Sequence, residues 1–285
     1  MKMKIIITLI LTIYGQVSDA ESALKFNWGK SKAIVTETII KNNTSIKFQY
    51  QISVKKKGSG YILNQKKIKA ISYNDQSVSN TPLIKTIESL AIMPKLKVDK
   101  KGELIDVIDK EKYFEKFINS LPDPKAKSFY KNPKMQDILI MKAYEKWCYW
   151  VCMWTDVGLT ANNPVVTTDD VEFMGMNLPQ KTVLTHHGYT SEKSKNVKLT
   201  LESVTGINNP TEFVDNISKE LNFIEIIEND DEDIVDVSKT VRIEAIVEAK
   251  TLKPMRVRVL TKSEVKSAKN SQSKSEVYVY DFDWK

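Results

Sequence analysis

The pattern that most limits the fold of this chain lies in residues 33–55, where apolar and polar side chains alternate. Lysine, glutamine and serine residues separate the apolar positions, which are Ile46, Phe48, Tyr50, Ile52 and Val54. Alternation with a period of two predicts a β-strand with one face on a core and the other in water. Because a β-branched run precedes this strand and Asn42-Asn43-Thr44 is typical of a turn, the segment is predicted to be a hairpin.

The remaining pattern gives strands, then helices, then strands again. Further strands are predicted at residues 61–73, 182–189, 197–204, 241–248, 255–260 and 276–284. The spacing of apolar residues predicts helices at 82–92, 110–121 and 133–154. Gly102 marks the turn of a short hairpin at 96–107. This order favours an antiparallel α+β fold over an alternating α/β fold. We expect a single α+β domain over residues 21–285, with one candidate seam near 160–180.

The first twenty residues have the features of a secretory signal peptide. Lys2 and Lys4 precede a short apolar run, and Ser18-Asp19-Ala20 supplies small residues at the positions that a signal peptidase reads. The run is too short to span a bilayer, and no second long apolar stretch follows it. The expected mature chain starts at Glu21, is periplasmic or secreted, and has no transmembrane anchor after signal cleavage.

Export excludes most nucleotide-dependent functions, and the charge pattern argues against nucleic acid as a partner. The formal net charge of +7 falls by one when Lys2, Lys4 and Asp19 are removed with the signal peptide. The excess is spread along the chain as lysine and forms no arginine-rich stripe. A solvated lysine-rich surface is therefore the favoured interpretation, and a mild attraction to anionic membranes is the alternative.

Cys148 and Cys152 are the only cysteines, and neither follows the predicted cleavage site as a lipid-anchored protein requires. On a helix, a spacing of four places both thiols on one face with Cα atoms about 6 Å apart, near the outer limit for a disulfide. A disulfide or two buried thiols are favoured over a redox or zinc role. The acidic run at residues 229–233 lacks the spacing of a calcium-binding loop. We expect no metal and no cofactor.

Catalytic patterns are weak, and the protein is not expected to be an enzyme. His186 and His187 are the only histidines, and neighbouring residues on a strand point to opposite faces, so they cannot easily share one metal. Neither G-x-S-x-G nor H-E-x-x-H occurs in the chain. A hydrolase that uses one of these histidines remains the remote alternative.

The end of the third predicted helix is apolar nearly all round, so it must be covered on several sides. The favoured interpretation is a core helix clamped by the sheet, because aromatic stripes usually serve packing. The alternatives are a membrane-surface anchor or the lining of a ligand cavity by Trp147, Trp150 and Trp154. The last strand places Tyr278 and Tyr280 on one face, either paired and covered or within the same ligand groove.

Three stretches, at residues 93–104, 178–183 and 248–255, together resemble exported bacterial proteins of unknown function. The curved sheet of those proteins is similar to that of the lipoprotein-carrier (LolA/LppX-like) superfamily. The resemblance implies a curved antiparallel sheet, an incomplete barrel wrapped around a few helices, which can hold acyl chains. Leu252 stands where the family more often has glycine. No functional residue carries over by motif.

Two functions from different classes are therefore expected. The first is an exported soluble protein that carries or senses a lipid or other apolar ligand in the half-barrel. The second is an envelope or secreted protein-interaction module with a filled core, an envelope protein as its partner and no small ligand.

Overall fold

The computed structural model describes residues 24–78, 81–155, 157–173, 176–206, 234–267 and 271–285. The predicted signal peptide and the acidic run at 229–233 lie outside these residues. The helices are α1 (Pro82–Leu90), α2 (Lys110–Ser120), α3 (Pro124–Tyr130), α4 (Pro133–Trp150) and the 3-10 turn η1 (Cys152–Trp154). The strands are β1 (Ser31–Lys41), β2 (Thr44–Lys57), β3 (Gly60–Tyr73), β4 (Gln76–Ser77), β5 (Lys95–Val98), β6 (Leu104–Ile108), β7 (Val165–Phe173), β8 (Met176–Tyr189), β9 (Asn196–Gly206), β10 (Ile234–Glu248), β11 (Pro254–Ser267) and β12 (Ser271–Trp284).

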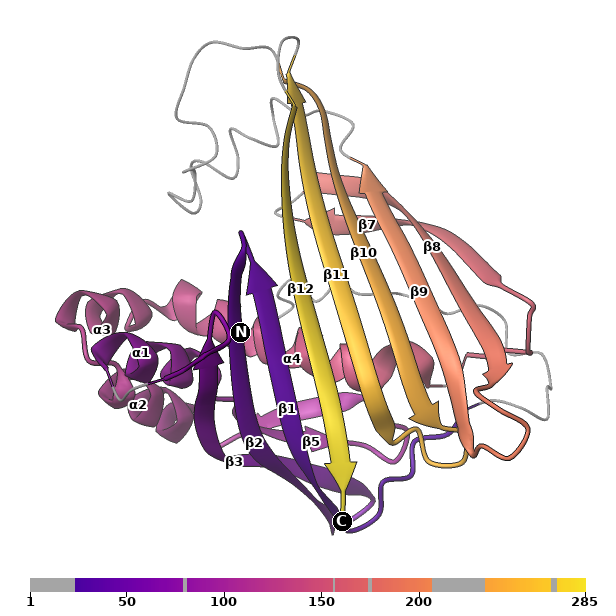
Figure 1. The fold of residues 1–285 in the computed structure, drawn as a ribbon, viewed down its shortest axis with the longest axis horizontal. Coiled ribbons are helices and arrows are strands. Elements are labelled where there is room, and N and C mark those ends of the chain that lie inside the picture. The colour runs from indigo at the N-terminus through magenta and orange to yellow at the C-terminus, as the bar shows by residue number, and fades with distance from the viewer. Residues whose placement is uncertain (1–23, 79–80, 156, 174–175, 207–233, 268–270) are drawn as a thin grey trace.

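One curved sheet of twelve strands runs through the molecule, and all its pairings between named strands are antiparallel (Figure 1). The strand order is β6-β5-β3-β2-β1-β12-β11-β10-β9-β8-β7, with β4 on β3. The first strand pairs with the last, from Ala33 opposite Trp284 to Lys41 opposite Glu276, and joins the two halves of the chain. The predicted antiparallel α+β class with a curved sheet is confirmed, and the sheet is not closed into a barrel.

The predicted first hairpin is confirmed as β1 and β2. Asn42 and Asn43 both have positive φ, at 48° and 62°, and Lys41 pairs directly with Thr44. Asparagine tolerates the left-handed region, and two such residues in succession give a tight turn whose twist matches that of the paired strands. The alternation also holds, because Phe48, Tyr50 and Ile52 are all buried.

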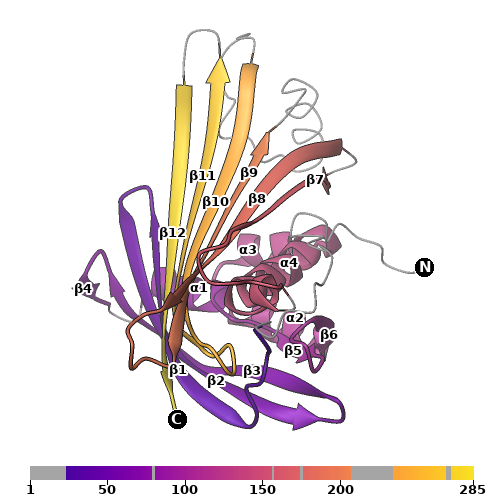
Figure 2. The same cartoon turned by 90° about the vertical axis from the view of Figure 1, so that its right-hand side faces the viewer.

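The helices lie together on the concave side of the sheet, as Figure 2 shows with α4 seen nearly end-on. The predicted helix at 133–154 is shorter in the structure. It ends at Trp150 because Val151 leaves the helical region, with φ −137° and ψ −62°, and η1 follows. Three elements were not predicted from the sequence: α3, the two-residue strand β4, and β7. Strand β7 falls within the candidate seam and pairs with β8.

Leu252, where the resembled family more often has glycine, has φ +55° and is fully buried. This is the left-handed region that glycine adopts without steric cost. The Leu252 carbonyl accepts a hydrogen bond of 3.2 Å from the indole N–H of Trp28, which anchors the turn between β10 and β11 to the core.

Gly102, in the turn between β5 and β6, is a site where the core requires the absence of a side chain. Its φ is +91°, and a Cβ there would lie 2.7 Å from Val151 Cγ1 and 3.0 Å from Phe26 Cγ. We expect Gly102→Ala to destabilise the protein by about 2–4 kcal/mol, through overpacking added to left-handed strain, in chemical denaturation.

Gly58→Ala is the matched control, because Gly58 has φ +60° and a Cβ added there would have no other atom within 4 Å. It should cost only the strain, about 1 kcal/mol. Equal losses in the two variants would contradict the close approach at Gly102.

Candidate functional site

The three predicted tryptophans lie at the end of α4 (Trp147 and Trp150) and in η1 (Trp154), and all three are fully buried. The Trp147 ring lies 5.2 Å from Trp28 and 5.7 Å from Phe26, and its indole N–H donates to the Gly102 carbonyl at 2.8 Å. Trp154 donates its N–H to the Tyr149 carbonyl at 3.1 Å. Edge-to-face contacts of this kind stabilise an aromatic core. Both indole N–H groups are therefore hydrogen-bonded within the protein, and the Trp147 ring packs against other aromatic rings.

Trp150 is the tryptophan that meets the last strand. Its ring lies 5.5 Å from that of Tyr280 and 5.2 Å from that of Phe282, at interplanar angles of 76° and 89°. The structure therefore brings together two of the predicted site residues, Trp150 and Tyr280. Tyr278 occupies the inward position of β12 just before Tyr280 and is half-buried.

A buried ion pair joins α4 to β1 beside these rings. Lys146 Nζ lies 2.9 Å from Glu37 Oε2, and the two side chains are 15% and 1% exposed. The ammonium group also lies 5.8 Å from the ring centroid of Tyr50 and 5.7 Å from that of Tyr280. The sequence analysis missed this pair. Its one signal is a glutamate at an inward position of β1, between Val35 and Ile39, in a strand whose inward neighbours are apolar.

Two polar atoms beside the ion pair have no hydrogen bond of normal geometry to any described residue. They are the Tyr50 hydroxyl and the Trp150 indole N–H, and both are buried. Burial, and then the charge of Glu37, raises the pKa of Tyr50, and the same causes raise that of Tyr280. Both phenols are therefore neutral donors at neutral pH. A buried donor without an acceptor costs about 1–3 kcal/mol, so the indole N–H of Trp150 is not satisfied by the part of the chain that the structure describes.

Beyond α4 the concave face becomes polar. Strand register places seven inward positions side by side, and because four of them carry hydroxyl groups we call them the hydroxyl row: Lys41, Glu276, Thr261, Val241, Ser203, Thr182 and Thr167. Thr182 and Ser203 are buried and hydrogen-bonded at 3.3 Å, whereas Thr261 is half-buried. At the next inward position of β8 and β9, the Gln180 amide donates to the Thr205 hydroxyl at 3.0 Å. A core face usually stays apolar along a strand, so this change of character distinguishes the region.

Two members of the hydroxyl row are charged, and they lie at its end on β1 and β12. Lys41 Nζ lies 2.7 Å from Glu276 Oε1, and the Tyr278 hydroxyl donates to Glu276 Oε2 at 2.7 Å. Burial raises the pKa of Glu276, but these two hydrogen bonds outweigh it and hold that pKa below its usual range. Burial raises the pKa of Tyr149 on α4, with the charge of Glu145 adding to the effect. These polar groups thus lie next to the packed rings of Trp150 and Tyr280, which we call the aromatic floor.

The two cysteines are free thiols in the structure. They do not share one helix face as expected, because α4 ends at Trp150 and Cys152 lies in η1. Cys152 Sγ lies 3.8 Å from the Gly102 carbonyl. Burial raises the pKa of the Cys152 thiol, and the neighbouring Cys148 raises it further. Since the thiolate is the reactive form, this environment suits packing rather than nucleophilic chemistry.

The histidines lie near the end of β8, away from α4. The Gly188 backbone N–H donates to His186 Nδ1 at 3.0 Å, and His187 Nε2 lies 2.9 Å from the Thr200 hydroxyl. Burial lowers the pKa of His186. In the described ranges, no group of three histidine, cysteine, aspartate or glutamate side chains could hold a metal ion.

Comparison with models of protein families finds no match, and comparison with curated proteins likewise finds none. No helix within the described residues is long and apolar enough to cross a membrane.

Replacing Lys146 with alanine should destabilise the protein by about 3 kcal/mol at pH 7, because Glu37 is then a buried charge without a partner. Denaturant unfolding of the variant and the wild type at pH 7 measures the effect.

The double variant Glu37→Gln/Lys146→Met is the control, and it should recover most of the loss because no lone charge remains buried. A double variant as unstable as Lys146→Ala would show that packing, not charge, dominates at this position.

Glu145 on α4 gives a pH-dependent prediction. Burial raises its pKa, which Lys239 and Lys142 only partly offset. A carboxyl that binds its proton more tightly when folded disfavours the fold above its folded pKa, and the penalty disappears as pH falls. Glu145→Gln should therefore raise the melting temperature at pH 7, and its advantage over the wild type should vanish near pH 4.

The control for this variant is Glu202→Gln, on the exposed face of β9. It should leave the melting temperature nearly unchanged at both pH values. An equal gain from Glu202→Gln would assign the effect to overall charge instead of the burial of Glu145.

Proposed function

We propose that this is an exported binding protein that carries or senses a lipid or other apolar ligand on the concave face of its sheet, an incomplete barrel around the helices. The observation that carries the proposal is the hydroxyl row. Along the inward face, the buried apolar side chains of Val259, Ile243, Leu201 and Leu184 are followed at this row by Thr261, Val241, Ser203 and Thr182. A filled core has no need of such a boundary, whereas a ligand with an apolar body and a polar end matches it.

The ligand would lie across the boundary between the two regions. Its apolar part would contact the half-buried rings of Tyr149 and Tyr278, above the packed Trp150 and Tyr280. Its polar end would face Thr261 and its neighbours in the hydroxyl row. In this arrangement the tryptophans of α4 support the floor, and the tyrosines make the direct contacts.

A second candidate is the protein-interaction module with a filled core. The observation that favours it is the complete burial of Trp147, Trp150 and Trp154 among protein groups. A partner would then bind elsewhere. The outer edges of β6 and β7, which pair with no further strand among the described residues, offer backbone groups for an added strand.

The first test is native mass spectrometry of the purified mature protein, followed by organic extraction of bound material. We expect a stoichiometric lipid or other apolar adduct. Thr261→Trp should abolish it, because an indole at this inward position fills the space between the hydroxyl row and the tyrosines.

Lys262→Trp is the matched control, since the next residue on β11 points to the opposite, exposed face. It should retain the adduct. Loss of the adduct in both variants would refute a site on the concave face, and a protein without extractable ligand would favour the interaction module.

A further inference from the structure

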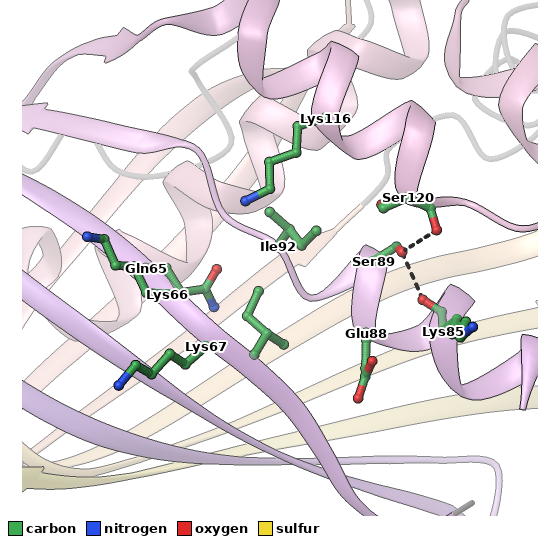
Figure 3. A pocket seen from close by; sticks show the side chains of 10 residues that line it. Gln65, Lys66, Lys67, Lys85, Glu88, Ser89, Ile92, Lys116 and Ser120 are labelled. Carbon is green, nitrogen blue, oxygen red and sulfur yellow. Dashed lines mark hydrogen bonds between the residues drawn. The ribbon is translucent and has the colours of Figure 1, made fainter. Parts of the chain in front are cut away.

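A second, separate feature of the molecule is a pocket of about 320 Å³ between β3, α1 and α2 (Figure 3). Four of its lining residues are lysines: Lys66 and Lys67 on β3, Lys85 on α1 and Lys116 on α2. Glu88 is the one acidic residue that lines it, so positive charge predominates. Figure 3 shows Lys116 reaching from α2 toward β3 above Ile92.

A β-bulge brings two of the lysines to this place. Lys66 pairs with Gln51 and Lys69 with Gln49, so two residues, Lys67 and Ile68, oppose one residue of β2. Lys67 has φ +55°, a left-handed conformation that costs a lysine about 1 kcal/mol or more. Bulges change the direction of side chains and are common beside functional sites. Here the bulge places consecutive lysines at the pocket and turns Ile68 inward.

Two polar side chains that line the pocket already form hydrogen bonds within the protein. Glu88 Oε1 accepts the backbone N–H of Ala70 at 2.8 Å. The Ser89 hydroxyl is hydrogen-bonded to the carbonyls of Lys85 and Ser120, at 2.8 and 3.2 Å, as Figure 3 shows. Within the described part of the chain, none of the four pocket lysines forms an ion pair. Their charge is therefore available to a ligand.

We propose that this pocket binds a small anion with a phosphoryl group and a short apolar portion. Lysine ammonium groups bind phosphoryl oxygens as point charges. Figure 3 shows Lys116 directed over the pocket and the ammonium groups of Lys66 and Lys67 directed away from α1, so these two flexible side chains would turn toward a ligand with two or more negative charges. The side chains of Ile68 and Ile92 give the pocket an apolar surface for the organic part. The volume is at the lower end of those that hold small molecules.

Isothermal titration calorimetry with inorganic pyrophosphate at low ionic strength tests the charge recognition on the full mature protein. We expect saturable binding at one site. The exposed pair Lys66→Gln/Lys116→Gln should weaken it by roughly tenfold or more, since two charge contacts are lost. The control pair Lys69→Gln/Lys125→Gln removes the same charge from exposed positions outside the pocket, and should change affinity by less than about twofold.

Absence of saturable binding in the wild type, or an equal loss in the control pair, would overturn the proposal. The phosphoryl group can come from a free solute or from a lipid headgroup, and vesicle sedimentation separates these sources. If phosphatidylglycerol vesicles, but not phosphatidylcholine vesicles, bind the wild type and not the pocket variant, the ligand is a headgroup. If pyrophosphate binding depends on the pocket while vesicles are ignored, the ligand is a soluble phosphorylated compound.

Discussion

The packing of the aromatic end of α4 into the curve of the sheet is the interaction on which the rest of the structure depends. Trp147 meets Trp28, just before β1, and Trp150 meets Tyr280 and Phe282 on β12. A single helix end thus contacts both ends of the chain. Large aromatic side chains bury more apolar area than any others, and their edge-to-face contacts add geometric preference to it. The sheet curves around this cluster, and the other helices pack beside it on the same face.

The same interface explains why polar groups lie so deep in the molecule. A buried ion pair gives little net stability, but it strongly penalises any arrangement that separates the two charges. Glu37 and Lys146 therefore fix how α4 lies against β1, in a contact otherwise made of interchangeable apolar surfaces. With the helix held in place, its upper edge defines where the aromatic floor ends and the hydroxyl row begins. The position of the boundary that we assign to a ligand thus follows from one charge pair.

The sequence was informative wherever structure is local. The hairpin of β1 and β2 follows from the alternation of apolar and polar residues and from two asparagines at the turn. The apolar character of the tryptophan-bearing segment likewise predicts that other parts of the protein pack around it. The edge strand β7 was missed because Asp169 and Asp170 interrupt its β-branched run, a common feature of exposed edges. The ion pair joins residues 109 positions apart, and the hydroxyl row draws single residues from seven strands. Neither has a local pattern, so only the register of the sheet reveals them.

The pairing of β1 with β12 has a consequence for when the protein can fold. The first strand emerges early in synthesis, but one of its two neighbours, β12, is made after all the other described strands. Helix α4 likewise waits for Tyr280 and Phe282 to complete its cover. Contacts between the ends of a chain are slow to form and cannot form before the chain is complete. A polypeptide with this topology cannot complete its core until β12 has been made, because β1 and α4 each lack a partner before then.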